Sequence, residues 1–291
     1  MYYLAYHSNY IAYLRAARDH QIGIRVVPND ERGQLSLDAL AEELRDPRVR
    51  LVSLSHIPTQ SGLVQPAEAI GRLVRQAGAW YLLDATQSAG QLPIDVRILG
   101  VDLLATTARK FLRGPRGVGF LYVRTERIPE LHPPFVDGHA ARWERPDAYV
   151  LREDARRFEN WESNIAATLG LGAAVDYALS IGAEPIWARV QSLAGELRRR
   201  LAAVPGVQVH DAGAVRCGIV SFTLDGVEAP AIKEALAQRR RRINVTTSSI
   251  YSSLLDMTSR GLTHTVRASV HYYNTEAEVE EFVGAIRGLN R

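Results

Sequence analysis

The stretch AWYLLDAT, residues 79–86, is an apolar run that ends in a carboxylate, and it decides the class of fold. Such a run is typical of a strand buried on both faces of a sheet. Helices are predicted at 9–21, 36–46 and 65–78, and strands at 2–6, 23–30, 49–57, 101–108 and 117–124. Strands that alternate with amphipathic helices indicate an α/β fold, with a mostly parallel central sheet and helices on both faces.

The pattern changes after about residue 125. Residues 128–147 are rich in Pro, Gly and His and are predicted to form a long surface or active-site loop. Residues 164–182 form a helix of small residues that we expect to pack closely. The order helix–strand–strand–helix–strand–strand–helix then predicts a smaller α+β domain. We therefore expect a large α/β domain over 1–183 and a small C-terminal domain over 184–291.

Composition excludes some classes of protein. The net charge of +3 is small, so the pI near 9.1 is weak support for nucleic-acid binding. The single cysteine, Cys217, excludes an internal disulfide framework and favours a reducing compartment. No signal peptide or run of roughly 18 apolar residues is present. We expect a cytoplasmic protein with no nucleic-acid or membrane partner.

Lys110 stands out because the chain has only two lysines. Of 35 basic residues, the other 33 are arginine, and Lys233 is the second lysine. A lysine amine can lose its proton and attack a carbonyl, whereas an arginine guanidinium stays protonated. An ordinary solvated lysine is the alternative, and Lys233 within a predicted helix is interpreted in that way.

Several polar residues are predicted to gather near Lys110. Asp84 ends its strand, Gln87 follows three residues later, and Thr106, Thr107 and Arg109 precede the lysine. Ligands of parallel sheets bind at the carboxyl ends of the strands. A lysine, an acid, and hydroxyls beside glycine-rich backbone are what pyridoxal 5'-phosphate requires: an amine for the aldehyde, a partner for the ring nitrogen and phosphate donors. A helix-capping role is the alternative for Asp84.

The combination resembles a known family. YLLDATQSAGQLPIDV (81–96), with the lysine of TTARKFLRGPRGVGFLYV (106–123) placed 26 residues after its aspartate, is similar to class V aminotransferases, which share the cysteine desulfurase fold. AYHSNYIAYL, SHIPTQSGLVQPAEAIG, RFENWESNIAATLGLGAAVDY and VRASVHYYNTEAEVEEFV extend the resemblance over essentially the whole chain. It implies fold type I of the pyridoxal-phosphate enzymes and a homodimer with active sites at the subunit interface.

The resemblance also implies roles for individual residues. Lys110 would form the Schiff base and move the α-proton, Asp84 would pair with the pyridine nitrogen, and Gln87 would bond the phenolic oxygen. Thr107 and Arg109, in place of the family's usual Ser and His, would hold the phosphate. Tyr6 stands where desulfurases stack a histidine on the cofactor ring.

Two further positions would face the substrate, which the resemblance implies is an amino acid. Arg267 matches the arginine that binds the α-carboxylate, with a plain salt bridge as the alternative. Thr59 stands where desulfurases have an asparagine near the substrate. Glu162 replaces a threonine that often reaches the partner's phosphate.

The main departure is a missing cysteine. Desulfurases carry a catalytic cysteine after the strand that here belongs to INVTTSSIYSS (243–253), and none is present there. Cys217 is interpreted as a buried core residue. The departures resemble the branch of C–S lyases and isopenicillin-epimerase-like proteins. A C–S β-lyase is therefore the first hypothesis, and an aminotransferase or epimerase would use the same residues.

The start of the chain raises a rival hypothesis. Family members carry, before the strand at 2–6, a segment whose turn holds the cofactor phosphate at a helix N-terminus. Here Met1 already lies in that strand. We expect either a mis-assigned start codon or a truncated product, and the latter would bind cofactor weakly and expose apolar surface. A non-catalytic, dimerising remnant is thus the rival from a different class.

Overall fold

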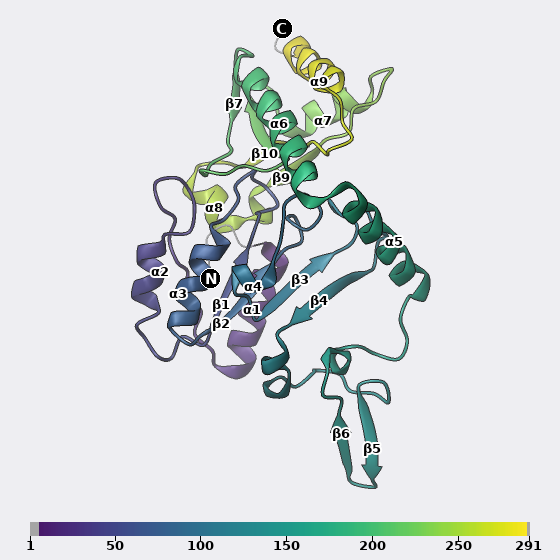
Figure 1. The fold of residues 1–291 in the computed structure, drawn as a ribbon. Coiled ribbons are helices and arrows are strands. Elements are labelled where there is room, and N and C mark those ends of the chain that lie inside the picture. Colours follow the sequence, from purple (N-terminus) through teal and green to yellow (C-terminus); the bar gives the residue numbers. More distant parts are fainter. Residues whose placement is uncertain (1–5, 290–291) are drawn as a thin grey trace.

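The computed structural model describes residues 6–289 and has two parts, each built on its own sheet. In Figure 1 the part with β1–β4 lies below and the part with β7–β10 lies above. The strand predicted at 2–6 lies outside the described residues, apart from Tyr6.

The lower sheet has the strand order β1-β2-β3-β4. β1 pairs parallel with β2 and β2 parallel with β3, whereas β4 is antiparallel to β3. The mostly parallel sheet predicted from the sequence is therefore confirmed. Its strands are β1 (Leu51–Ser55), β2 (Trp80–Asp84), β3 (Leu103–Thr107) and β4 (Gly119–Val123).

Helices cover both faces of this sheet. On one face, the Tyr81 hydroxyl donates to Ala67 O of α3 (Ala67–Gln76) at 3.2 Å. On the other face lies α1 (His7–His20), whose Tyr13 hydroxyl is 2.6 Å from Ser53 Oγ. The two faces differ because side chains alternate along a strand: Val52, Leu54, Tyr81 and Leu83 are buried in the core beneath α3.

Two short helices complete this region. α2 (Leu37–Glu43) begins as predicted at Ser36, whose side chain accepts from Ala39 N. α4 (Val96–Leu99) begins at Asp95, whose carboxylate accepts from two backbone N–H groups of the first turn. Both caps satisfy donors that a helix start leaves without partners.

The strand predicted at 23–30 is not found in the described part of the chain. Only Val27 and Asn29 have bridge geometry, and Asn29 pairs with Leu35. Asp30 instead makes a turn, with its carboxylate accepting from the N–H groups of Arg32 and Gln34. The turn chemistry of Asp30 therefore prevails over the β propensity of the preceding residues.

The prediction of a loop over 128–147 is partly wrong. After η1 (Thr125–Glu130), β5 (Ala141–Arg145) and β6 (Ala148–Leu151) form an antiparallel hairpin that projects from the lower part (Figure 1). Trp143 lies opposite Tyr149 in this ladder, and cross-strand aromatic pairs stabilise hairpins. A 3-10 turn, η2 (Ala155–Phe158), follows the hairpin.

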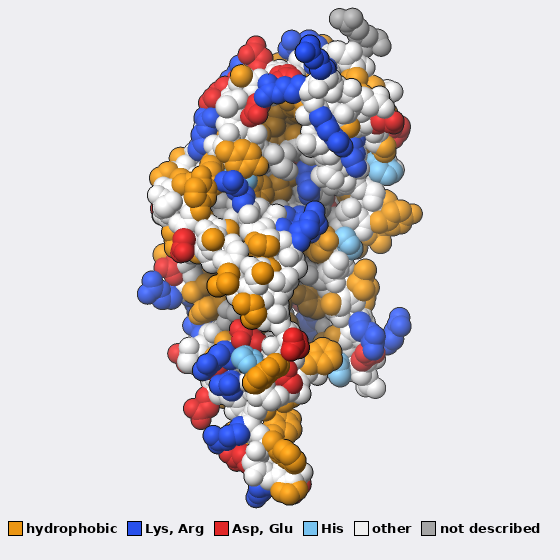
Figure 2. Space-filling view, turned by 90° about the vertical axis from the view of Figure 1, so that its right-hand side faces the viewer, with side chains coloured by type: hydrophobic (Ala, Val, Ile, Leu, Met, Phe, Trp, Pro, Cys, Tyr) orange, Lys and Arg blue, Asp and Glu red, His pale blue; other side chains and the backbone are white. Residues whose placement is uncertain are grey.

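α5 (Ile165–Ile181) is present as predicted, but it is not closely packed within the chain. Only Ala167 is buried, whereas Leu169 and Leu179 are each 71% exposed. Figure 2 shows hydrophobic side chains gathered on the face that carries α5 and along the hairpin. An apolar helix whose large side chains are mostly exposed within the described residues indicates a surface that another molecule covers.

The upper part contains the order of elements predicted for the small domain, with η3 (Ile250–Ser252) and α8 (Leu254–Ser259) added before its last strand. The antiparallel sheet has the order β7-β8-β10-β9, and α6, α7 and α9 pack on it around Leu197, Phe222 and Phe282. The bounds are α6 (Ala183–Ala202), β7 (Val207–Val209), β8 (Ile219–Leu224), α7 (Ala229–Ala237), β9 (Thr246–Ser249), β10 (His264–Ser269) and α9 (Glu276–Leu289).

α5 and α6 meet at Gly182 with a bend of 80°. The predicted boundary at 183/184 falls at this corner and stays a prediction. Over residues 6–289, no single helix is long and apolar enough to cross a membrane; only this bent pair passes on length and composition.

Candidate active site around Lys110

Lys110 lies in a tight turn just beyond the carboxyl end of β3. Its carbonyl accepts from Arg113 N at 2.9 Å, and the chain then returns as β4. β4 approaches β3 so closely that a Cβ on Gly119 would lie 2.2 Å from Thr106 O. Gly90 similarly leaves room for the backbone of Phe111, because its added Cβ would lie 2.5 Å from the Phe111 carbonyl carbon. The glycines around this turn therefore fix where the lysine is held.

The environment of Lys110 favours the neutral amine. Burial, followed by the positive charges of Arg267, Arg109 and Arg116, lowers the pKa of Lys110 to about 8, while Asp84 acts in the opposite direction. The ordinary pKa of a lysine is 10.5. A lowered pKa makes a lysine a better nucleophile at neutral pH, which an ordinary surface lysine would not be.

Asp84, at the end of β2, is held by two donors. Its Oδ2 accepts from Asn9 Nδ2 of α1 at 2.8 Å, and its Oδ1 accepts from Thr86 N at 2.9 Å. The Thr86 contact resembles the capping alternative considered for Asp84, but the Asn9 contact comes from a helix 75 positions earlier. The carboxylate therefore points to the same face of the sheet as α1.

Thr59 joins two other predicted residues. Its hydroxyl accepts from Gln87 Nε2 at 3.1 Å, and its carbonyl accepts from Arg267 Nη1 at 2.6 Å. Thr59 follows β1, Gln87 follows β2 and Arg267 lies in β10 of the upper part. The structure thus brings these residues together across 208 sequence positions.

Arg267 retains donors for a ligand. Its Nε is buried and has no hydrogen-bond partner within the structure. No salt bridge to it occurs among residues 6–289, although a plain salt bridge was the alternative role. Burial lowers the pKa of Arg267, with Cys217 and Tyr6 acting in the opposite direction. A buried, unneutralised guanidinium is suited to a carboxylate, which it can bind through two parallel hydrogen bonds.

The predicted phosphate ligands are arranged less favourably. The Thr107 hydroxyl donates to Val118 O at 3.3 Å, so its hydrogen is directed at backbone. The Arg109 side chain is exposed beside Lys110. Tyr6 is half-buried at the start of α1, with its ring centroid 4.3 Å from that of His7. The roles predicted for these residues stay predictions.

Asn9 is the residue near this site that sequence reasoning missed. It lies within a quoted stretch, but nothing in a helical pattern distinguishes an asparagine that faces a carboxylate from one that faces solvent. The interpretation of Cys217 as a core residue is confirmed, because it is 0% exposed. Burial raises the pKa of its thiol to about 12. Glu162 is exposed just before α5.

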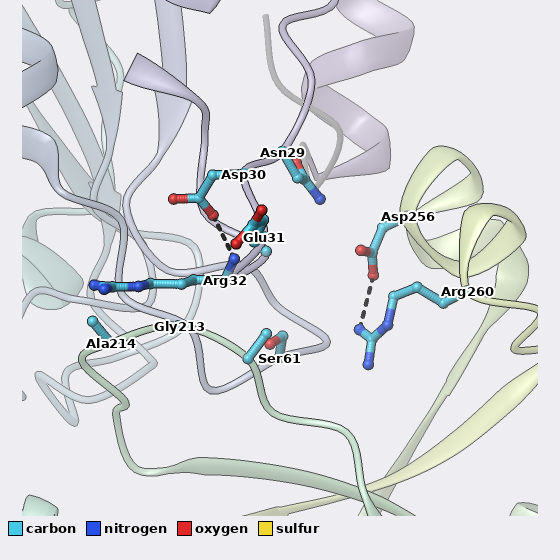
Figure 3. Close-up of a pocket in the computed structure, with 11 residues that line it drawn as sticks. Asn29, Asp30, Glu31, Arg32, Ser61, Gly213, Ala214, Asp256 and Arg260 are labelled. Atoms are coloured by element: carbon cyan, nitrogen blue, oxygen red, sulfur yellow. Dashed lines mark hydrogen bonds and ion pairs between the residues drawn. The ribbon is translucent and has the colours of Figure 1, made fainter. Parts of the chain in front are cut away.

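A cavity of about 660 Å³ lies away from Lys110, between the turn at Asp30 and the upper part. Figure 3 shows Asp256 of α8 and Arg260, which directly follows α8, on one side and the turn around Asp30 on the other. Neither Asp84 nor Lys110 lines this cavity.

The sequence matches the model of the Aminotransferase class-V family over residues 2–282. This chain belongs to the class V aminotransferase family. It is 33% identical to a probable cysteine desulfurase of Methanothermobacter thermautotrophicus, over 95% of this chain and 69% of the relative.

Solved structures agree with this family. The apo structure of a cysteine desulfurase from Thermococcus onnurineus superposes with a TM-score of 0.91 at 29% identity, covering 98% of this class V chain and 70% of the other. The cystine C–S lyase C-DES, in complex with its product cysteine persulfide, superposes with a TM-score of 0.81 at 29% identity over 95% and 71%. The predicted pyridoxal-phosphate fold type I is confirmed by these likenesses.

The residues of this class V protein fit its family's cofactor, pyridoxal 5'-phosphate. The chain offers an amine of lowered pKa for the aldehyde and, on the same face as α1, a carboxylate for the ring nitrogen. A mutant of C-DES has been solved with glycine covalently linked to this cofactor.

Proposed function

We propose that this class V protein is a pyridoxal-phosphate-dependent C–S β-lyase that acts on a sulfur-containing amino acid. The observation that carries the proposal is the position of Lys110, whose pKa is lowered to about 8 and whose environment includes the charges of Asp84 and Arg267. The cofactor, when bound, supplies an aldehyde for the amino group and an electron sink beside the substrate α-carbon.

Residues of the chain bind the substrate, move the proton and orient the cofactor ring. The Arg267 guanidinium binds the substrate α-carboxylate, and this contact fixes which bond at the α-carbon faces Lys110. The Lys110 amine removes the α-proton and holds it. Asp84 presents a carboxylate to the cofactor ring nitrogen, and Asn9 holds that carboxylate in place. The bond from the β-carbon to sulfur then breaks, and no thiol of the protein takes part.

The distribution of cysteine favours a lyase over a desulfurase. A desulfurase must transfer sulfur to a thiol, and the segment over 243–253 has none. Cys217 is fully buried, and burial keeps its thiol protonated because its pKa is raised to about 12. The C–S lyase named among the solved structures supports the same choice for this chain.

The test is a product analysis with a matched variant. Loaded protein is given cysteine or cystine, and pyruvate, ammonia and released sulfur are measured. Elimination from cysteine consumes one water and yields pyruvate, ammonia and sulfide. We expect Lys110→Ala to lose the visible absorbance of the bound cofactor and at least about 10³-fold of the rate, since the nucleophile and the base are one residue. Lys233→Ala should change neither.

An aminotransferase or an epimerase is the second candidate, because both use the same residues. From cysteine, 3-mercaptopyruvate and the amino acid of the acceptor, formed only when a keto-acid acceptor is added and without release of sulfide, would favour the aminotransferase. Inversion at the α-carbon without release of sulfur would favour the epimerase. If the loaded wild type shows no cofactor absorbance at all, the non-catalytic remnant is favoured.

We also propose a homodimer. The support is the exposed apolar face of α5, together with Trp143, which is 77% exposed on the projecting hairpin. The cytoplasm is the expected location, since a lone buried cysteine suits a reducing compartment.

A further inference from the structure

Thr59 and Arg267 meet at the predicted substrate site, but they belong to different parts of the chain. Thr59 lies in the loop after β1, and Arg267 lies in β10 of the upper sheet. Their contact is one hydrogen bond of 2.6 Å. Further hydrogen bonds are needed to hold the loop and the strand at a fixed separation.

Asp211 bonds to a neighbour of each residue in this contact, Gly62 in the loop and Ser221 in β8. Its Oδ1 accepts from Gly62 N at 3.0 Å, three residues after Thr59. The same oxygen accepts from Ser221 N at 3.1 Å and from Ser221 Oγ at 2.8 Å. Ser221 is the residue of β8 directly opposite Arg267 in the ladder. One carboxylate therefore ties the Thr59 loop to the strand beside Arg267.

Arg198 of α6 completes the arrangement. Its Nε donates to Asp211 Oδ2 at 2.8 Å, and the two side chains are 8% and 0% exposed. Its Nη2 donates to Cys217 O at 2.7 Å, and Cys217 N donates to Gly62 O at 2.7 Å. Both backbone groups of Gly62 are therefore bonded to this group of residues.

The lack of space around Gly62 shows how closely Arg198 and Asp211 approach the loop. A Cβ at Gly62 would lie 2.3 Å from Arg198 Nη2 and 2.9 Å from Asp211 Oδ2. The neighbouring Ser61 and Ala212 line the cavity drawn in Figure 3, so one side of the loop borders open space. Hydrogen bonds at Gly62 help to hold the loop against the upper part.

We infer that the Arg198–Asp211 pair is a positioning element that sets where the Thr59 loop and Arg267 meet, and hence how a substrate carboxylate is bound. The inference rests on the proposed function for its ligand, an amino acid. Neither residue is predicted to touch substrate or cofactor; Asp211 acts through Gly62 and Ser221, and Arg198 acts through Asp211. A buried pair is strongly coupled to its surroundings, because removing one partner leaves the other charge without compensation.

The test compares Asp211→Asn with a matched control, Asp102→Asn. Asp102 is also buried, accepts from a backbone N–H of Tyr81 and pairs with Arg124 and Arg127, but it lies at the opposite end of β3 from Lys110. Two probes are titrated into loaded protein: glycine, which carries a carboxylate, and methylamine, which does not. Ser221→Ala is a milder variant that removes only one hydrogen bond to Asp211.

We expect Asp211→Asn to weaken glycine binding by about tenfold and Ser221→Ala by a few-fold, since misplacing a carboxylate partner affects only ligands that have a carboxylate. Methylamine binding should be unchanged in both. Asp102→Asn should leave the glycine affinity as in the wild type. Equal loss of glycine affinity in Asp102→Asn, or equal weakening for both probes, would overturn the inference.

Amide hydrogen exchange provides a readout that is independent of the cofactor. Residues 59–62 should exchange faster in Asp211→Asn than in wild type or Asp102→Asn, even in cofactor-free protein. If exchange at 59–62 is the same in Asp211→Asn as in the wild type, the positioning role is overturned. If exchange there differs between the two proteins but the wild type binds neither probe, only the proposed function is overturned.

Discussion

At the scale of single residues, Lys110 differs from Lys233 in its surroundings, because Lys110 is partly buried and Lys233 is exposed. Burial and three neighbouring arginines favour the neutral amine, and the neutral amine is the form that attacks an aldehyde. The lysine-poor composition indicated Lys110 in advance, but the direction and cause of the pKa change come from burial of the amine and then from the arrangement of Arg267 and Arg109 around it. The sequence does not reveal that Arg267 lies near Lys110, because the two residues are far apart along the chain.

This environment predicts a pH dependence for Lys110 in the cofactor-free protein. The amine is protonated and unreactive below its pKa, so acetylation of Lys110 should be half-maximal near pH 8 and fall about tenfold per pH unit below that value. Mass spectrometry of a digest measures Lys110, with exposed Lys233 as the reference in the same sample. Arg267→Gln should move the midpoint upward, since one of the named positive charges is removed. A midpoint for Lys110 near the ordinary lysine value of 10.5 would contradict the prediction.

At the scale of elements, the approach of β4 to β3 determines where the turn of Lys110 lies. The sequence predicted both strands, and their antiparallel pairing places Gly119 opposite Thr107. The hairpin β5–β6 was missed because prolines and histidines before it are typical of loops, whereas the pairing of Trp143 with Tyr149 depends on a register that composition does not reveal.

Gly119→Ala should destabilise the protein by about 1–3 kcal/mol, because the added Cβ would lie 2.2 Å from Thr106 O and the strands must move apart. Gly284→Ala, in the exposed face of α9, is the matched control. A Cβ there meets nothing within 4 Å, so the helix should gain up to about 1 kcal/mol. Urea unfolding measures both. A Gly119→Ala protein as stable as the wild type would show that β3 and β4 tolerate a wider spacing.

At the scale of the whole molecule, two features matter: the contacts that join the two sheets, and the exposed apolar surface of α5. The polar contacts at Thr59 and Gly62 join the lower and upper parts. Large apolar side chains of α5, such as Leu169 and Leu179, are exposed in the described part of the chain, and we expect a second copy to cover them. Burial of such a surface is the main driving force of association.

The dimer is tested by placing a charge on that surface. The wild type should sediment as a dimer, and Leu169→Glu should sediment as a monomer, since an unpaired carboxylate in an apolar interface is costly. Ile98→Glu, on α4 and 58% exposed, is the control and should remain dimeric. A wild type that is monomeric at micromolar concentration, or a dimeric Leu169→Glu protein, would show that α5 is not the interface.

The sequence by itself determined the class of fold, the order of elements in the upper part and the positions of Asp84 and Lys110 at strand ends. These follow from hydrophobic periodicity and from the residues that end strands and helices, which are local properties of the chain. The tertiary structure alone decided that Asn9 faces Asp84, that Arg267 meets Thr59, that the Lys110 pKa is lowered and that α5 stays exposed. Burial and electrostatic interactions depend on separation in space, and local sequence patterns do not encode that separation.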